Sequence, residues 1–209
     1  PNMMANISTD RHSPAMGYSR EHVEATRERI LDSASRLFRL HGYDGVGIDE
    51  IMRGADLTRG GFYAHFRSKE DLFVNVLRQE LEFAAQLRRL GALRGDDPAE
   101  GAMEAVAYYL EPGNRKKIAR GCLMVSNLPD VARASARARR AFSRAFEDFA
   151  EEFETLLAED VADEPERALA AIATCVGGVA IARSLVDVER ATAILEACKA
   201  SVMRELGRA

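Results

Sequence analysis

Residues 58–69 bring together side chains that can donate hydrogen bonds to phosphates and to the edges of bases. The segment holds two guanidinium groups, a phenol, an imidazole, an amine and two adjacent glycines. A guanidinium can pair bidentately with guanine, and glycines at a helix start let the backbone come close to a phosphate. We therefore expect a nucleic-acid contact here, with Arg59 as the best candidate for reading a base.

Two short helices joined by a tight turn can present this segment. One apolar face of the first helix is formed by residues spaced three and four apart: Ile48, Ile51, Met52 and Ala55. Asp56 and Leu57 interrupt the pattern, and Thr58 can cap a second helix by accepting a hydrogen bond from a following amide. The sequence thus predicts a helix-turn-helix.

The second helix carries almost no core of its own. Phe62 and Phe66 are four residues apart and should face inward together. Gly60 and Gly61 each cost a helix about 1 kcal/mol relative to alanine. A pair of ordinary core helices would have little reason to accept that cost twice, whereas a helix pressed against DNA would. This comparison favours a recognition helix in a major groove.

Bulk charge does not support DNA binding, so the interpretation depends on the motif. The formal net charge is −4, and residues 1–78 hold 11 basic and 11 acidic residues. Any affinity for phosphates must come from local placement of cations.

Several other classes of protein are disfavoured. The three cysteines are widely spaced without a C-x-x-C pair, which argues against a zinc site or disulfides and suits a reducing cytoplasm. We find no nucleophile–base pair and no phosphate-binding glycine loop, so we expect no metal, no cofactor and no enzyme. No apolar run approaches the roughly 20 residues that span a bilayer, and no secretory signal is visible.

Helical periodicity continues through the chain, without strand-like alternation. We expect an all-α protein of about nine helices. Beyond the two short helices the predicted segments are 21–41, 68–90, 98–110, 118–125, 130–158, 165–185 and a last helix capped by Asp187. Phenylalanines recur on one face of the 130–158 segment.

Composition suggests three regions. Residues 1–20 lack periodicity and are expected to be a disordered tail, with Met16 as a candidate start. Residues 21–84 would form the helix-turn-helix domain, and residues 85–209 a second helical domain.

Two stretches carry a family resemblance. They read RERILDSASRLFRLHGYDGVGIDEIM and GADLTRGGFYAHFRSKEDLF. They resemble the N-terminal DNA-binding domain of the TetR/AcrR family of bacterial transcriptional regulators. The resemblance is close over residues 25–80, and the helical remainder fits the family more loosely. Gly47 is a departure, because the family usually has Ser or Thr at this position, whose hydroxyl often contacts a phosphate.

The resemblance implies roles for individual residues. Thr58, Arg59 and Gly60 would lie at the groove-facing end of the recognition helix. Tyr63 and His65 would donate hydrogen bonds to phosphates, although His65 could instead pack beneath the aromatic pair. Lys69 would meet the DNA backbone. The complete expected DNA-binding set is Gly47, Thr58, Arg59, Gly60, Gly61, Tyr63, His65 and Lys69.

The resemblance also implies that the C-terminal domain dimerises and binds a small molecule. One recognition helix reads only half a palindromic operator, so a homodimer is required. We expect its interface in the last two helices, where Ala and Gly are dense. We expect an effector pocket beside the phenylalanine-rich helix, for an apolar or aromatic molecule. Its candidate lining is Met103, Tyr108, Tyr109, Cys122, Met124, Phe142, Phe146, Cys175 and Val179.

The sequence thus predicts a cytoplasmic, ligand-responsive repressor released from double-stranded DNA by a small molecule. One alternative is a redox or electrophile sensor that acts through Cys122, because Cys122 follows Gly121 at an expected helix start where a thiolate is stabilised. A second alternative is a helical adaptor or an enzyme without DNA affinity.

Overall fold

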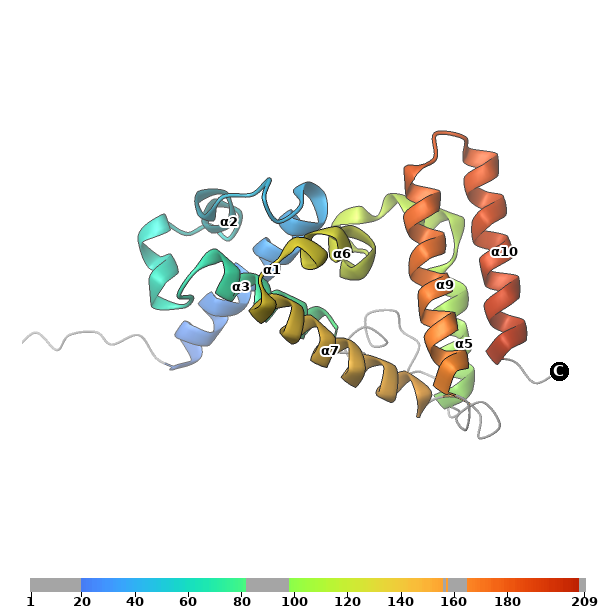
Figure 1. The fold of residues 1–209 in the computed structure, drawn as a ribbon. Coiled ribbons are helices and arrows are strands. Elements are labelled where there is room, and N and C mark those ends of the chain that lie inside the picture. The colour runs from blue at the N-terminus through green and yellow to red at the C-terminus, as the bar shows by residue number, and fades with distance from the viewer. Residues whose placement is uncertain (1–19, 82–97, 156, 158–164, 207–209) are drawn as a thin grey trace, which may run out of the picture.

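A computed structural model describes residues 20–81, 98–155, 157 and 165–206. All regular elements in these ranges are helical, namely eight α-helices and three 3-10 helices, as the sequence predicts. The chain forms an N-terminal helical unit and a C-terminal one, bridged by α6 and α7 (Figure 1). The expected tail and the expected domain boundary at residue 84 lie outside the described residues.

The N-terminal unit begins with α1 (Arg20–His41), which supplies most of its core. Ile30, Ala34 and Phe38 are fully buried along one face. Gly42 ends the helix with a φ of +73°, a conformation that favours glycine, and its amide donates to the Phe38 carbonyl. The predicted helix is confirmed at both ends.

The helix-turn-helix consists of α2 (Ile48–Gly54) and a 3-10 helix, η1 (Arg59–Ala64). Asp56 adopts a φ of +55° in the turn between them, as short polar residues can. Thr58 lies at the N-cap of η1 in an extended conformation, but its side chain makes no capping hydrogen bond. The expected position of the second helix is therefore confirmed, and its expected hydroxyl cap is wrong.

The next helix, α3 (Lys69–Glu80), begins as predicted. The Ser68 hydroxyl accepts from the amide of Asp71 at 3.0 Å. The expected continuation toward Leu90 lies outside the described residues.

The C-terminal unit departs from prediction in its middle. Its elements are α5 (Pro98–Tyr109), η3 (Pro112–Lys116), η4 (Ile118–Arg120), α6 (Leu123–Arg133), α7 (Ala136–Glu154), α9 (Pro165–Ser184) and α10 (Val188–Leu206). The predicted helix 118–125 is wrong, because the chain forms η4 and then starts α6 at Leu123. The predicted helix 130–158 is also wrong at its start, because Ala134 is extended and Ser135 caps a new helix by accepting from the Ala138 amide.

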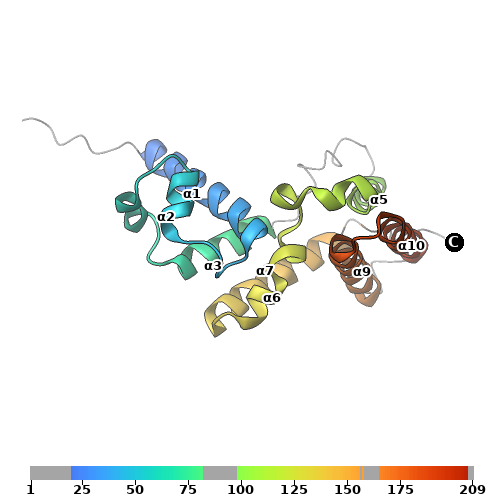
Figure 2. The same cartoon turned by 90° about the horizontal axis from the view of Figure 1, so that it is seen from above.

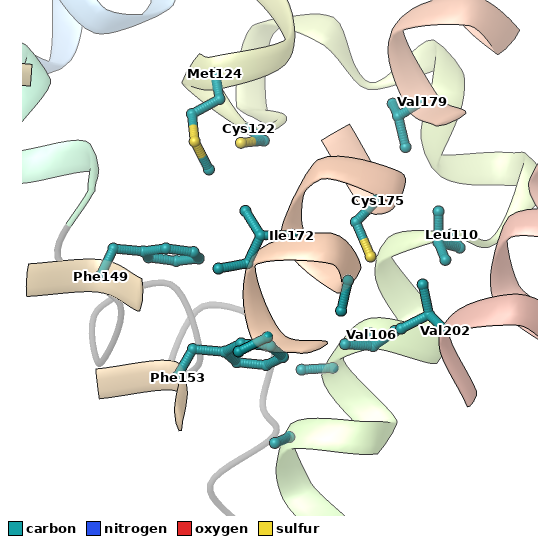
Figure 3. Close-up of a cluster of buried hydrophobic side chains, with 14 of the residues drawn as sticks. Val106, Leu110, Cys122, Met124, Phe149, Phe153, Ile172, Cys175, Val179 and Val202 are labelled. Carbon is teal, nitrogen blue, oxygen red and sulfur yellow. The ribbon is translucent and has the colours of Figure 1, made fainter. Parts of the chain in front are cut away.

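Helices α9 and α10 run side by side with α5 at the far end of the molecule (Figures 1 and 2). Asp187 caps α10 as predicted, accepting from the amides of Glu189 and Arg190. Phe149 and Phe153 of α7 point toward Ile172 of α9 in the C-terminal core (Figure 3).

Helix α6 fastens the two units together. Leu123 and Val131 are buried in the N-terminal core, while Met124 is buried in the C-terminal core. Asn127 is completely buried and donates from Nδ2 to the Phe38 carbonyl at 3.0 Å. A movement of α6 must therefore act on the end of α1.

Candidate nucleic-acid interface and effector cavity

The recognition helix η1 packs one side against the protein through two buried phenylalanines and exposes the other side. Phe62 and Phe66 are 0% and 2% exposed, and their ring centroids lie 5.9 Å apart. Tyr63 on the same helix is 61% exposed, with its ring edge-on to Phe62. Thr58, Arg59, Gly60 and Gly61 are exposed as well. This arrangement leaves one side of η1 available for a partner, as the sequence predicts.

The two glycines of η1 are not required by the packing of the chain itself. A Cβ built at Gly60 meets nothing within 4 Å, and one at Gly61 meets only Met52 Cε at 3.8 Å. Their small size therefore matters for what approaches from outside, which fits close contact between backbone and DNA.

Gly47 and Lys69 each lie beside a helix start. Gly47 is the N-cap of α2, and its amide donates to Glu50 Oε2 at 2.9 Å. Lys69 is the first residue of α3, and its ammonium lies 4.3 Å from the ring centroid of Tyr43. Burial lowers the pKa of Lys69, although the nearby carboxylate of Asp44 opposes that shift. Lys69 is thus held in place near the amino end of α3, where an anion is favoured.

His65 lies directly after η1 and is half-buried. Its amide donates to the Phe62 carbonyl at 3.0 Å, so its backbone closes the recognition helix. Both expected positions for the imidazole, toward phosphate and against the aromatic pair, are compatible with this intermediate exposure.

Arg59 forms an ion pair with an acidic residue that the sequence analysis did not identify. Asp49, in the first turn of α2, accepts from Arg59 Nη1 at 2.8 Å, and both side chains are more than half exposed. A guanidinium that pairs with guanine must leave this carboxylate, and the carboxylate itself repels phosphates.

We predict that Asp49→Asn will strengthen DNA binding several-fold. The substitution removes a negative charge from the DNA-facing surface and releases Arg59 from its ion pair. A shift assay at fixed salt measures the change, with Asp148→Asn, exposed on α7, as the control for charge alone. Equal or weaker binding by Asp49→Asn would contradict the assigned face.

A cavity of about 750 Å³ lies where the two units meet. Four elements surround it, namely α1, the end of α5, the η3–η4 segment and α9. The lining residues are Asp32, Ser35, Arg36, Arg39, Tyr108, Tyr109, Asn114, Lys117, Ala119, Arg120, Gly121, Cys122, Val179 and Arg183.

The cavity overlaps the expected effector pocket in part. Four predicted residues line the cavity, namely Tyr108, Tyr109, Cys122 and Val179. The other five belong to the C-terminal hydrophobic core or pack against it, namely Met103, Met124, Phe142, Phe146 and Cys175. Apolar residues recur at helical spacing around these five positions, and such a pattern usually indicates core packing. The sequence analysis did not identify the cationic residues that line the cavity. They lie on separate elements, and in the sequence each of them is typical of a solvent-exposed helix face.

The three cysteines are free thiols in different surroundings. Burial raises the pKa of Cys175 to about 12, and burial also raises the pKa of Cys198. Cys122 is the N-cap of α6 and lines the cavity. Within the described ranges, no cluster of three or more His, Cys, Asp or Glu residues could hold a metal ion.

Contacts between α3 and α7 provide a second link between the units. Arg137 Nη2 lies 2.5 Å from Asp71 Oδ1, and the Ser135 hydroxyl donates to Glu70. Burial alone would raise the pKa of Asp71, but hydrogen bonds from the Arg67 amide and the Arg137 guanidinium lower it. The α3 helix that positions Lys69 is therefore tied directly to the C-terminal unit.

Comparison with known proteins places these features in context. A family model described as "Bacterial regulatory proteins, tetR family" matches residues 30–76. The transcriptional repressor NemR of Escherichia coli strain K12 is 31% identical over 128 residues, which are 59% of this chain and 63% of NemR. The transcriptional regulator AcrR of Shigella flexneri is 37% identical over 101 residues, 44% of each chain. The chain thus aligns with less than two thirds of the length of these curated relatives.

Solved structures match over more of the chain. The reduced form of E. coli NemR has a TM-score of 0.64 at 26% identity, covering 86% of this chain and 96% of NemR. A TetR transcriptional regulator from Chloroflexus aurantiacus J-10-FL has a TM-score of 0.69 at 23% identity, covering 88% and 95%. The second likeness, at this identity, concerns the fold alone.

Proposed function

Because the chain belongs to the TetR/AcrR family of bacterial transcriptional regulators, we propose that it is a homodimeric repressor of the cytoplasm. It binds a palindromic operator through η1 and leaves it when a small molecule fills the cavity between the two units. The observation that carries this proposal is the exposed η1 helix, with Tyr63 outward and Phe62 completely buried behind it. The role is one of binding, not catalysis.

The expected DNA contacts divide by chemistry. Arg59 is proposed to read a base, because its planar guanidinium can donate two hydrogen bonds to guanine. Tyr63, His65 and Lys69 are proposed to hold phosphates and so to fix the register of η1 on the duplex. The backbone near Thr58, Gly60 and Gly61 is proposed to approach the duplex closely, as is Gly47 at the start of α2.

We predict that Arg59→Ala and Tyr63→Ala will each weaken operator binding. The loss should be about 1–3 kcal/mol for Arg59, since a bidentate base contact is removed, and smaller for a single phosphate contact by Tyr63. An operator shift assay on the palindrome upstream of the gene measures both. Only Arg59→Ala should relax discrimination among operator sequences.

The matched control is Arg78→Ala, an exposed cation in the last turn of α3, at the opposite end from Lys69. It should leave affinity nearly unchanged. If the two test variants bind as well as the parent protein, η1 does not contact DNA and the proposal fails.

The dimer interface is proposed to lie on α9 and α10. Helix α9 has an outward stripe of residues spaced four apart, in which Leu169, Ala173 and Ile181 are exposed and Gly177 is half-buried. A Cβ at Gly177 meets nothing within 4 Å, whereas one at Gly178 would lie 2.7 Å from Cys198 Sγ of α10. Gly178 thus allows α9 and α10 to pack closely within the subunit. Gly177 lies on the outer side of α9, where the missing side chain leaves the apolar face flat.

A partner subunit explains this face better than a membrane does. Residues Glu166–Ser184 are long and apolar enough to cross a bilayer by length and composition, contrary to the sequence-based expectation. The opposite side of the helix is buried in the C-terminal core, where Ala168, Cys175 and Val179 pack. A helix buried along one side and apolar along the other suits a homodimer.

Release from DNA is proposed to follow a shift between two dimer arrangements. The contacts of Asn127 with the end of α1, and of Arg137 with α3, connect the C-terminal unit to the unit that carries the recognition helix. An effector that prefers an arrangement with mismatched η1 spacing would deplete the DNA-bound form, and switching from 1:99 to 99:1 needs about 5.5 kcal/mol of preference.

A redox or electrophile sensor is the second candidate, and the position of Cys122 favours it. The thiol lines the cavity and lies next to the buried Tyr109 hydroxyl. A relative, NemR, has been solved in a form described as reduced. Oxidation of a thiol in this wall would change its size and charge.

For this second candidate, we predict that Cys122→Ser will stay bound to the operator at an oxidant concentration that releases the parent protein. Cys175→Ser is the control, because the raised pKa of Cys175 keeps it a thiol at neutral pH. If Cys122→Ser is released by oxidant as readily as the parent protein, the sensor role is excluded while the repressor proposal stands.

A further inference from the structure

The cavity between the two units is strongly cationic, although the chain as a whole is acidic. Five of its lining residues are basic, and one, Asp32, is acidic. The net charge of the whole chain is −4. Such a concentration of one sign in a concave site focuses the electrostatic potential and attracts an oppositely charged ligand.

The cations come from both units and face one another across the junction. Arg36 and Arg39 belong to α1 of the DNA-binding unit, while Lys117, Arg120 and Arg183 belong to the C-terminal unit. Arg39 is 8% exposed and Arg183 is half-buried. Burial lowers the pKa of Arg183, the neighbouring Tyr109 and Cys122 side chains oppose that shift, and the charge of Arg39 adds a smaller lowering.

Backbone contacts hold Arg183 in the cavity wall. Its Nε donates to the Arg115 carbonyl at 3.1 Å, and Nη1 lies 3.4 Å from the Ser126 hydroxyl. A Cβ on Gly121 would lie 2.4 Å from Arg183 Nη2 and 2.9 Å from the Lys117 carbonyl oxygen, so alanine here would shift the guanidinium and the adjacent backbone. These are neutral acceptors, and they fix the cation without cancelling its charge.

The same wall offers an uncharged donor and aromatic surface. The Tyr109 hydroxyl is inaccessible to solvent and has no oxygen or nitrogen partner among the described residues, and the Cys122 thiol beside it is only a weak hydrogen-bonding group. Burial, and then the neighbouring Cys122 thiol, raise the pKa of Tyr109 well above its usual range, so the group is a neutral donor at pH 7. Tyr108 is exposed beside it, with Lys117 Nζ 5.6 Å from its ring centroid.

From these features we infer that the effector is an organic anion, with a carboxylate or phosphate head held between Arg39, Arg183 and Tyr109 and an apolar body against Tyr108 and Val179. This adds a charged head to the expected apolar or aromatic effector, and it rests on the proposed function of the protein as a ligand-released repressor. A bound anion would attract guanidinium groups on both α1 and α9 and so link the two units. The ligand head therefore acts directly on the first helix of the DNA-binding unit.

Calorimetric titration with matched probes tests the ligand class. The probes are 2-naphthoate, its neutral analogue 2-naphthamide, and inorganic phosphate, all at low ionic strength. We expect naphthoate to bind at least tenfold more tightly than either of the others, and its affinity to fall as salt rises. Equal binding of acid and amide, tighter binding of phosphate, or no binding of naphthoate would each overturn the inference.

Variants locate the binding in the cavity. Arg183→Met should weaken naphthoate binding about tenfold or more, and Arg36→Gln, at an exposed position that leaves the fold intact, several-fold. Gly121→Ala keeps every charge but displaces the guanidinium, so it should weaken binding as well. Arg140→Gln, exposed on α7 away from the cavity, should change nothing. Unchanged affinity in Arg183→Met and Arg36→Gln would place the anion elsewhere and overturn the inference.

Operator binding is measured in parallel on the same preparations. If the parent protein binds its operator but naphthoate binds no better than the amide, the inference about the effector fails and the repressor proposal stands. If Arg59→Ala and Tyr63→Ala retain full operator affinity, the repressor proposal fails whatever the titration shows.

Discussion

Phe62→Ala will abolish operator binding, although Phe62 faces away from the proposed DNA surface. The side chain is 0% exposed and packs against Phe66 in the N-terminal core. Replacing a buried phenylalanine with alanine costs about 3–5 kcal/mol. The N-terminal unit is small, so a loss of this size is a large part of its stability.

The effect should concentrate on η1. This 3-10 helix is only six residues long and contains two glycines. Little besides its aromatic anchor therefore holds it in place. Arg27 covers the other side of this anchor, with its guanidinium 5.0 Å from the Phe66 ring centroid, but it cannot fill the volume left by a lost ring. Phe62→Ala should therefore detach η1 before it unfolds the rest of the unit.

Urea unfolding and an operator shift assay, run together, separate this effect from a lost DNA contact. Phe62→Ala should lower both the unfolding midpoint and the affinity. Tyr63→Ala is the matched control: its ring is 61% exposed, so it should lower affinity while the midpoint stays nearly constant. If Phe62→Ala unfolds at the parent midpoint, the aromatic pair does not anchor η1.

The helix-turn-helix could be predicted because its signals are local. Phe62 and Phe66 at a spacing of four define the inward face, and Ser68 with Asp71 defines the next helix start; the structure confirms both. The type of helix was less predictable. Two glycines allow either α or 3-10 geometry, and the structure shows the tighter form without a hydroxyl cap from Thr58.

The division between α6 and α7 was missed because the local sequence favours a continuous helix. Alanine and arginine are strong helix formers and dominate residues 132–141. Pro129 lies inside α6 and does not end it. The break comes instead at Ala134 and Ser135, where Ser135 contacts Glu70 of α3. That contact joins residues far apart in the chain, so periodicity alone could not reveal it.

The cavity was unpredictable for the same reason. Arg39, Lys117 and Arg183 are each ordinary charged residues on or near a helix, and only tertiary packing brings them to one wall. Tyr109 and Cys122 were predicted to line a pocket and do line the cavity, although their binding role stays a prediction. Periodicity alone could not separate lining residues from core on α7, because a core and an apolar pocket have the same periodicity; Phe142 and Phe146 pack against the C-terminal core.

Ile181→Arg will convert the protein into a monomer and weaken operator binding by roughly two orders of magnitude or more. Ile181 is 52% exposed at one end of the apolar stripe on α9, in line with Gly177. In a two-fold dimer each α9 meets the other, so one substitution places two arginines in a single interface. Burying unpaired charge there outweighs the apolar contact it replaces.

The loss of DNA affinity follows from geometry, not from any DNA contact. Two linked recognition helices bind with an affinity that exceeds that of one by about 10²–10⁴, because the second half-site is reached at a high effective concentration. A monomer loses this gain and should bind a half-site no less well than the parent protein does. Sedimentation analysis gives the oligomeric state, and shift assays on full and half operators give the two affinities.

Val23→Arg provides the matched control, since Val23 is 41% exposed on α1, in the DNA-binding unit and far from α9. It should remain dimeric. A dimeric Ile181→Arg would show that the exposed stripe on α9 is not the interface, and the α10 surface would have to join two subunits alone. A monomeric Ile181→Arg with full operator affinity would instead separate DNA binding from dimerisation, and would remove the basis for reading a palindrome.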